Sequence, residues 1–161
     1  MDKWLNRLGQ VAMVAIAVAA LIVVLRPESR PSPQAPEGYK RGDRIDLSKI
    51  PLNGPTLIVA TRSTCNFCRE SVPFWRTIDG TPIVWLAVGE DASTSRSYLI
   101  ANGLMPDRVI TVGDAGMTKV SATPTMILLD QSGLVIDVWV GMLGSDAQAA
   151  VQSRLAALRG S

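Results

Sequence analysis

The sequence predicts an α/β domain with a mainly parallel central sheet, an antiparallel edge hairpin and helices on both faces. Two observations support this fold class. From residue 56 onward, short apolar runs rich in β-branched residues alternate with segments of helical pattern. Near the C-terminus, two such runs are separated only by Gln131-Ser132-Gly133, and this spacing predicts a β-hairpin with a tight turn.

The expected elements follow one another along the chain. Strands are predicted at residues 56–61, 82–88, 109–112, 125–130 and 134–140. Helices are predicted at 65–78, 91–103 and 145–158, with a helical turn at 114–120. Asp91 is the expected N-cap of the second helix, which Asn102-Gly103 ends, and Ser145 with Gln148 forms a capping box for the last.

An apolar segment at residues 8–25 precedes this domain, interrupted only by Gly9 and Gln10. At about 1.5 Å per residue, a helix of this length just crosses a bilayer core of roughly 30 Å. The tail before it, residues 1–7, is short and basic, which favours the cytoplasmic side. A cleaved signal peptide is the alternative, but Leu25-Arg26-Pro27 is a poor cleavage site. We therefore expect an uncleaved signal-anchor transmembrane helix and an exported domain.

The segment between the apolar run and the domain, residues 26–38, is rich in proline. Pro27, Pro31, Pro33 and Pro36 stand among Ser, Glu and Gln residues. Such a composition predicts an extended, semi-rigid linker instead of folded structure. The folded domain is expected to occupy residues 39–161.

Composition excludes several classes of function. The chain has no histidine, which rules out His-based catalysis and His-ligated metal sites. It has two cysteines, too few for a four-cysteine zinc or iron–sulfur site within one chain. The net charge is +2, with both signs dispersed, so no nucleic-acid footprint is present. We expect neither a bound metal nor a nucleic-acid partner.

The two cysteines form the motif Cys65-Asn66-Phe67-Cys68 at the junction of a strand and a helix. Residues three apart on a first helical turn lie about 5–6 Å from one another, a separation that suits a disulfide. Unpaired N–H groups and the helix dipole favour the thiolate of Cys65. A purely structural disulfide is the alternative, but so short a loop constrains the unfolded chain little. We therefore expect a redox-active pair, in which Cys65 is the nucleophile and Cys68 resolves the mixed disulfide.

Two further patterns extend this motif to a family resemblance. Pro73 lies five residues after Cys68, where thioredoxin-fold active-site helices carry a kinking proline. Residues 120–133 are similar to the stretch V-x-x-T-P-T-x-x-x-x-D-x-x-G. Over about residues 57–158 the chain thus resembles the thioredoxin fold, and especially the membrane-anchored thiol–disulfide oxidoreductases known as TlpA/ResA/CcmG-like redoxins. It departs from thioredoxin at two positions: Thr64 stands where thioredoxins carry a Trp, and Val59 stands where they carry a buried Asp. The redox potential and the proton transfers of thioredoxin therefore do not carry over to this chain.

The resemblance implies a function and a setting. Pro124 matches the family's cis proline, which faces the cysteine pair and leaves the backbone of Thr123 free to bind an extended client segment. It implies reduction of client disulfides outside the cytoplasm, with cytochrome c or enzyme maturation as typical tasks. It also implies a single-pass protein of the inner (cytoplasmic) membrane with its catalytic domain facing the periplasm. A DsbD-like transmembrane electron donor would reduce the Cys65–Cys68 disulfide again, and no other cofactor is implied.

Other functions remain as alternatives. The same pair can serve a disulfide oxidant or isomerase, because only the reduction potential sets the direction. A non-catalytic assembly module would carry an inert cysteine pair. A peroxiredoxin is excluded because Ile58 and Arg62 stand where its Pro and Thr are required. Of the neighbouring residues, Phe67 is expected to be partly exposed to clients and Glu90 to be an exposed acid at a helix start.

Overall fold

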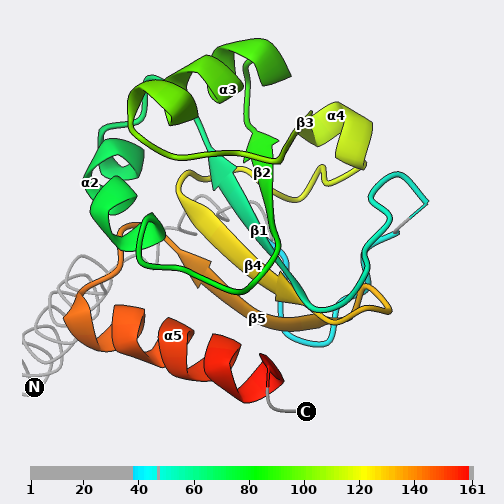
Figure 1. Cartoon of the computed structure of the whole chain (residues 1–161). Helices are drawn as coiled ribbons and strands as arrows, with labels where there is room; N and C mark the ends of the chain where they lie inside the picture. Colours follow the sequence, from blue (N-terminus) through cyan, green and yellow to red (C-terminus); the bar gives the residue numbers. More distant parts are fainter. Residues whose placement is uncertain (1–37, 47, 160–161) are drawn as a thin grey trace, which may run out of the picture. The chain divides into compact units, whose positions relative to one another are not determined.

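The computed structural model describes residues 38–46 and 48–159, which form an α/β domain (Figure 1). Its elements, in chain order, are β1 (Thr56–Thr61), α2 (Asn66–Trp75), β2 (Ile83–Ala87), α3 (Ala92–Ala101), β3 (Arg108–Thr111), α4 (Val112–Ala115), β4 (Thr125–Leu129), β5 (Val135–Val140) and α5 (Ser145–Arg159). The predicted tail (1–7), transmembrane helix (8–25) and nearly all of the linker (26–38) lie outside the described residues. Within the described ranges, no helix combines the length and apolarity needed to cross a membrane.

The five strands form a single mixed sheet in the order β3-β2-β1-β4-β5. β1 pairs with β2 and β2 with β3 in parallel, while β4 pairs antiparallel with both β1 and β5. The predicted edge hairpin is therefore present. The expectation of a mainly parallel sheet is corrected to a mixed one, because β4 enters next to the central strand β1 in the opposite direction.

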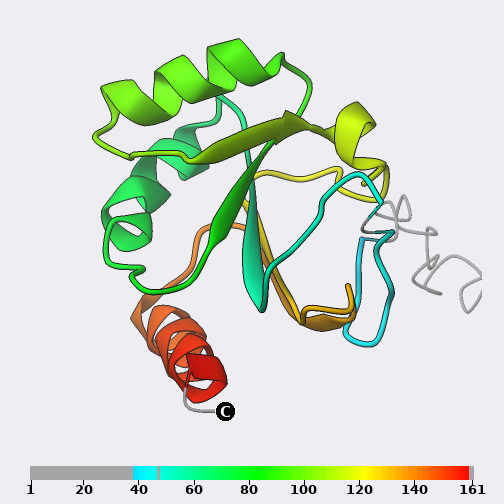
Figure 2. The ribbon, with the colours of Figure 1, turned by 45° about the vertical axis from the view of Figure 1, so that its right-hand side comes forward.

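Both faces of the sheet are covered, as the apolar strands require. Alternate residues of β1 point to opposite faces, so Ile58 and Ala60 enter one core and Leu57 and Val59 the other. Figure 2 shows α2 and α5 on one side of the sheet, and α4 with the N-terminal segment on the other. Helices thus lie on both faces, but among the described residues one face is covered only by the short α4, and Ile45 and Ile50 of the N-terminal segment complete its core.

Two local predictions are corrected by the structure. The helical turn expected at 114–120 forms earlier, as α4, because the Thr111 hydroxyl accepts a hydrogen bond from Asp114 N at 3.1 Å and caps it. Gly116, at φ +68°, then ends this helix. The capping box at α5 does not form, since Gln148 donates its side chain to Leu143 O and its backbone N–H to Gly144 O.

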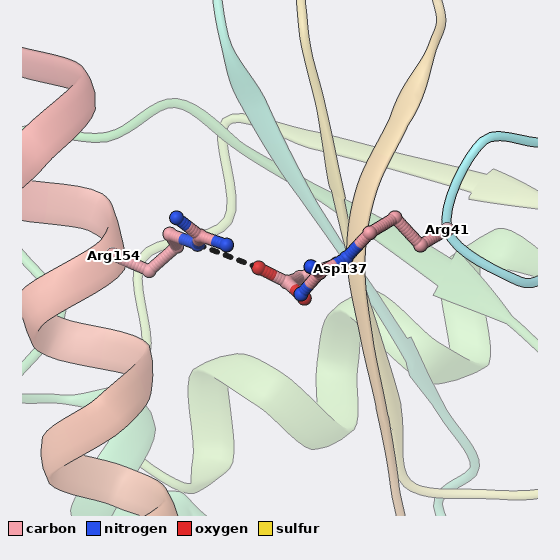
Figure 3. A network of polar contacts seen from close by, with 3 residues as sticks. All are labelled: Arg41, Asp137 and Arg154. Carbon is pink, nitrogen blue, oxygen red and sulfur yellow. Dashed lines mark hydrogen bonds and ion pairs between the residues drawn. The ribbon is translucent and has the colours of Figure 1, made fainter.

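A carboxylate on the edge strand β5 joins three parts of the domain. Asp137 accepts hydrogen bonds from Arg41 of the N-terminal segment and, at 2.7 Å, from Nε of Arg154 on α5. Figure 3 shows Asp137 between the two guanidinium groups. The Asp137 side chain is only 14% exposed, so these two partners compensate the charge that the fold largely buries. Burial acts to raise the pKa of Asp137, but the two arginines outweigh it and lower this pKa.

The variant Asp137→Asn is expected to lower the free energy of unfolding by about 1–3 kcal/mol at pH 7, because it leaves two guanidinium groups without their anion. The lowered pKa means that the ionised carboxylate stabilises the fold at neutral pH. The difference from wild type should therefore shrink as the pH falls below about 4 and Asp137 is protonated. Urea unfolding followed by circular dichroism at several pH values measures this. The exposed Asp107→Asn is the control, and an equal loss in both variants would contradict the prediction.

Candidate active site

The cysteine motif lies at the start of α2, as predicted. Cys65 is the N-cap, and its Sγ accepts a hydrogen bond from Cys68 N at 3.1 Å. Cys65 is partly exposed, whereas Cys68, one turn further, is completely buried in the core between α2 and the sheet. Both are free thiols in this structure. The arrangement presents one sulfur to solvent and keeps the second directly beneath it.

The loops after β1 and β2 are joined to each other beside the motif. Val88 N donates to Thr61 O at 3.0 Å, and Arg62 Nε donates to Val88 O at 2.7 Å. Glycine suits position 89, because its φ of +70° lies in the left-handed region that other residues rarely adopt. These contacts fix the segment that leads from β1 into α2.

Glu90 has a role at this junction that the sequence did not indicate. Its carboxylate accepts hydrogen bonds at 3.0 Å from the backbone N–H of Ser63 and at 2.5 Å from the Ser63 hydroxyl. The prediction of an exposed acid at a helix start is therefore wrong: Glu90 is half-buried and holds the loop two residues before Cys65. No local pattern marks this contact, because the partners are 27 positions apart.

The two thiols have different electrostatic environments. Burial acts to raise the pKa of Cys65, but hydrogen bonds from Cys68, from the Thr123 side chain and from the N–H of Phe67 outweigh it, so this pKa is lowered. Burial raises the pKa of Cys68 to about 11. The exposed sulfur is therefore the one that ionises first, which matches the predicted order of nucleophile and resolving cysteine.

Iodoacetamide at pH 7 is expected to alkylate Cys65 well before Cys68, because the thiolate is the reactive form and Cys68 is buried with a raised pKa. Below the pKa of Cys65 the rate should fall about tenfold per pH unit, as the thiolate fraction falls. Quenched-flow labelling followed by peptide mass spectrometry measures both rates. Equal rates at the two cysteines in the native protein would contradict the assignment, and denatured protein gives the control in which both react alike.

The segment of Thr123 and Pro124 lies against Cys65, although 58 residues separate Thr123 from it in the sequence. The Thr123–Pro124 peptide bond is cis. The Cys65 thiol donates to Thr123 O at 3.4 Å, and Pro124 O accepts from Gly141 N at 2.8 Å. The structure thus brings together the four site residues expected from the sequence, which are Cys65, Cys68, Thr123 and Pro124.

Exposed apolar side chains lie around this segment. Phe67, within the motif, is 58% exposed. Val140 is 62% exposed and pairs with Thr125, the residue after Pro124, while Met142 follows two positions later and is 51% exposed. Pro73 does not end the active-site helix, since α2 continues through it to Trp75. Among residues 38–46 and 48–159, no group of three or more His, Cys, Asp or Glu side chains is arranged to hold a metal ion.

Several solved structures have a fold similar to that of this domain. No protein-family model and no curated protein sequence matches the chain. A Chlorobium tepidum protein described as the thiol:disulfide interchange protein DsbE is 22% identical, with 75% of this chain and 99% of that one covered and a TM-score of 0.54. A secreted Mycobacterium tuberculosis disulfide oxidoreductase is 16% identical, over 65% and 82%, at 0.51. A Bacteroides thetaiotaomicron protein described as a protein disulfide isomerase is 14% identical, over 74% and 91%, at 0.58. The described domain therefore has a thioredoxin-like α/β fold, of the kind found in thiol:disulfide oxidoreductases.

Proposed function

We propose that this protein is a thiol–disulfide oxidoreductase that reduces the disulfides of client proteins. The observation that carries the proposal is the pair of thiols at the start of α2: a partly exposed one with a lowered pKa and a buried one with a raised pKa. The Cys65 thiolate attacks a client disulfide and forms a mixed disulfide. Cys68 then displaces the client sulfur, so that two electrons pass to the client and a Cys65–Cys68 disulfide remains.

Clients would bind over the cis-proline segment. The backbone of Thr123, directly beside the nucleophile, offers hydrogen-bonding groups to an extended polypeptide. Phe67, Val140 and Met142 supply an apolar surface close to it. Such a surface favours clients whose cysteines lie in unfolded or loosely folded segments with apolar neighbours.

The proposed setting is the outer side of the inner (cytoplasmic) membrane. Residues 8–25 have the length and apolarity of a single-pass anchor. The proline-rich linker, at about 3.1 Å per residue, would let the domain reach roughly 40 Å from the bilayer. The similar Mycobacterium tuberculosis protein is described as secreted, which supports this setting. In this setting a DsbD-like transmembrane donor would reduce the pair again, and cytochrome c or enzyme maturation would supply clients.

The reduction potential of the full chain in detergent tests the proposal. Equilibration with defined thiol/disulfide buffers, followed by quantification of the Cys65–Cys68 disulfide, gives this potential. A value near about −270 mV or lower supports a reductant, whereas a value near about −120 mV contradicts it in favour of an oxidant. If no disulfide forms in any buffer, the redox function itself fails, and a non-catalytic assembly module replaces it. Protease accessibility of the domain in intact spheroplasts tests its orientation.

A further inference from the structure

Three buried hydroxyl groups have no hydrogen-bond partner within the described part of the chain: those of Thr61, Ser95 and Tyr98. Thr61 and Ser95 are completely buried. An unpartnered buried hydroxyl costs stability, so its presence in a fold needs an explanation. A valine would fill the position of Thr61 with nearly the same shape and without that cost.

The hydroxyl of Thr61 is distinguished by its neighbour. Thr61 ends β1 and points to the same face of the sheet as Leu57 and Val59, which pack in one core with Cys68. Its hydroxyl acts to lower the pKa of the Cys68 thiol. Ser95, on α3, is not among the main groups acting on either cysteine. Thr61 and Ser95 thus both carry a completely buried hydroxyl without a partner, but of these two only Thr61 is among the main groups that act on Cys68.

The second chemical step needs such a group. To resolve the mixed disulfide, the Cys68 thiol loses its proton to water, and its sulfur attacks Sγ of Cys65. The bond between Cys65 and the client sulfur breaks, and the client leaves as a thiolate that takes up a proton from solvent. Burial raises the pKa of Cys68 to about 11 in the reduced protein, so this thiol is held in its protonated form at pH 7. Valine at position 59, where thioredoxins carry a buried acid, supplies no proton acceptor here.

We propose that the Thr61 hydroxyl donates a hydrogen bond to the Cys68 thiolate and stabilises it during resolution of the mixed disulfide. In the reduced protein this hydroxyl makes no hydrogen bond, because a thiol is a weak acceptor. Ionisation of Cys68 supplies a strong acceptor, which is why Thr61 acts to lower the pKa of that thiol. Three other ionisable groups lie near the two sulfurs: Tyr98 on α3, Arg69 and Glu90. The raised pKa of Tyr98, about 12, keeps its hydroxyl neutral. This inference rests on the proposed function.

A two-phase thiol assay on the full chain in detergent tests the inference. Reduced protein is mixed with excess 5,5′-dithiobis(2-nitrobenzoate), and the release of the coloured thiolate is followed. The first release reports attack by Cys65, and the second reports resolution by Cys68. Thr61→Val should leave the first phase within about twofold, slow the second about tenfold and shift its pH profile upward by about one unit. Thr61→Ser, which keeps the hydroxyl, should restore most of the second rate.

Ser95→Ala is the matched control, since it also removes a buried unpartnered hydroxyl. It should change neither phase. The proposal is overturned if Thr61→Val resolves as fast as wild type, if it slows both phases equally, or if Ser95→Ala slows the second phase as much. Thermal unfolding separates folding from chemistry, and Thr61→Val should unfold at the same temperature as wild type or higher. A wild-type protein that gives no second release would instead refute the proposed function.

Discussion

Replacement of Cys65 by serine is expected to abolish disulfide reduction, with a loss of at least about 10³-fold in rate. A serine hydroxyl stays protonated where the Cys65 thiol has a lowered pKa, so no comparable nucleophile remains. Cys68 cannot take over, because its sulfur is completely buried and its pKa is raised to about 11. Reduction of insulin by the dithiothreitol-recycled protein, followed by turbidity, measures the effect. Activity above one-tenth of wild type would show that another group performs the attack.

The companion variant Cys68→Ser should behave differently. Attack by Cys65 remains possible, but nothing resolves the intermediate, so a covalent mixed disulfide should accumulate with a disulfide-bonded client. Non-reducing electrophoresis and mass spectrometry detect this adduct, which dithiothreitol should release. The double variant Cys65→Ser with Cys68→Ser is the control and should form no adduct. An adduct on Cys68 in the Cys65→Ser protein, at the same rate, would reverse the assigned order.

Replacement of Trp85 by alanine is expected to destabilise the domain by about 3–5 kcal/mol, a large fraction of the stability of a domain this size. Trp85, in the middle strand of the parallel half, is 3% exposed and meets Trp75 of α2 edge to face, with ring centroids 5.4 Å apart. The change removes a buried indole, leaves a cavity and breaks this aromatic contact. Chemical denaturation followed by far-ultraviolet circular dichroism measures the loss.

The contact between Trp75 and Trp85 also holds the active-site helix against the sheet, since Trp75 ends the helix that Cys65 begins. Trp85→Phe keeps an aromatic ring and should cost clearly less than Trp85→Ala. If alanine were tolerated with a loss below about 1 kcal/mol, the indole would not be packed as the structure has it. Alkylation of Cys65 in the Trp85→Phe variant should remain close to wild type, because the hydrogen bonds that lower its pKa lie at the other end of α2.

Local signals in the sequence determined much of the domain. β1 has the predicted bounds, Asp91 caps α3 by accepting from Thr94 N at 2.7 Å, and the hairpin turns where Asp130 accepts from Ser132 N. The position of Cys65 at a helix start was equally visible, because it depends on a strand followed directly by a helical pattern. These features involve partners a few residues apart, for which residue type and spacing suffice.

Only the tertiary structure decided the features that join distant segments. Glu90 binds Ser63 across 27 positions, Cys65 reaches Thr123 across 58, and Asp137 meets Arg41 across 96. The placement of β4 beside β1, which makes the sheet mixed, is of the same kind. A polar side chain has several possible partners within the unfolded chain, and the packing of strands and helices selects one of them. For this protein, the sequence therefore determined the reactive motif and its helix, and the fold determined the groups that surround the two sulfurs.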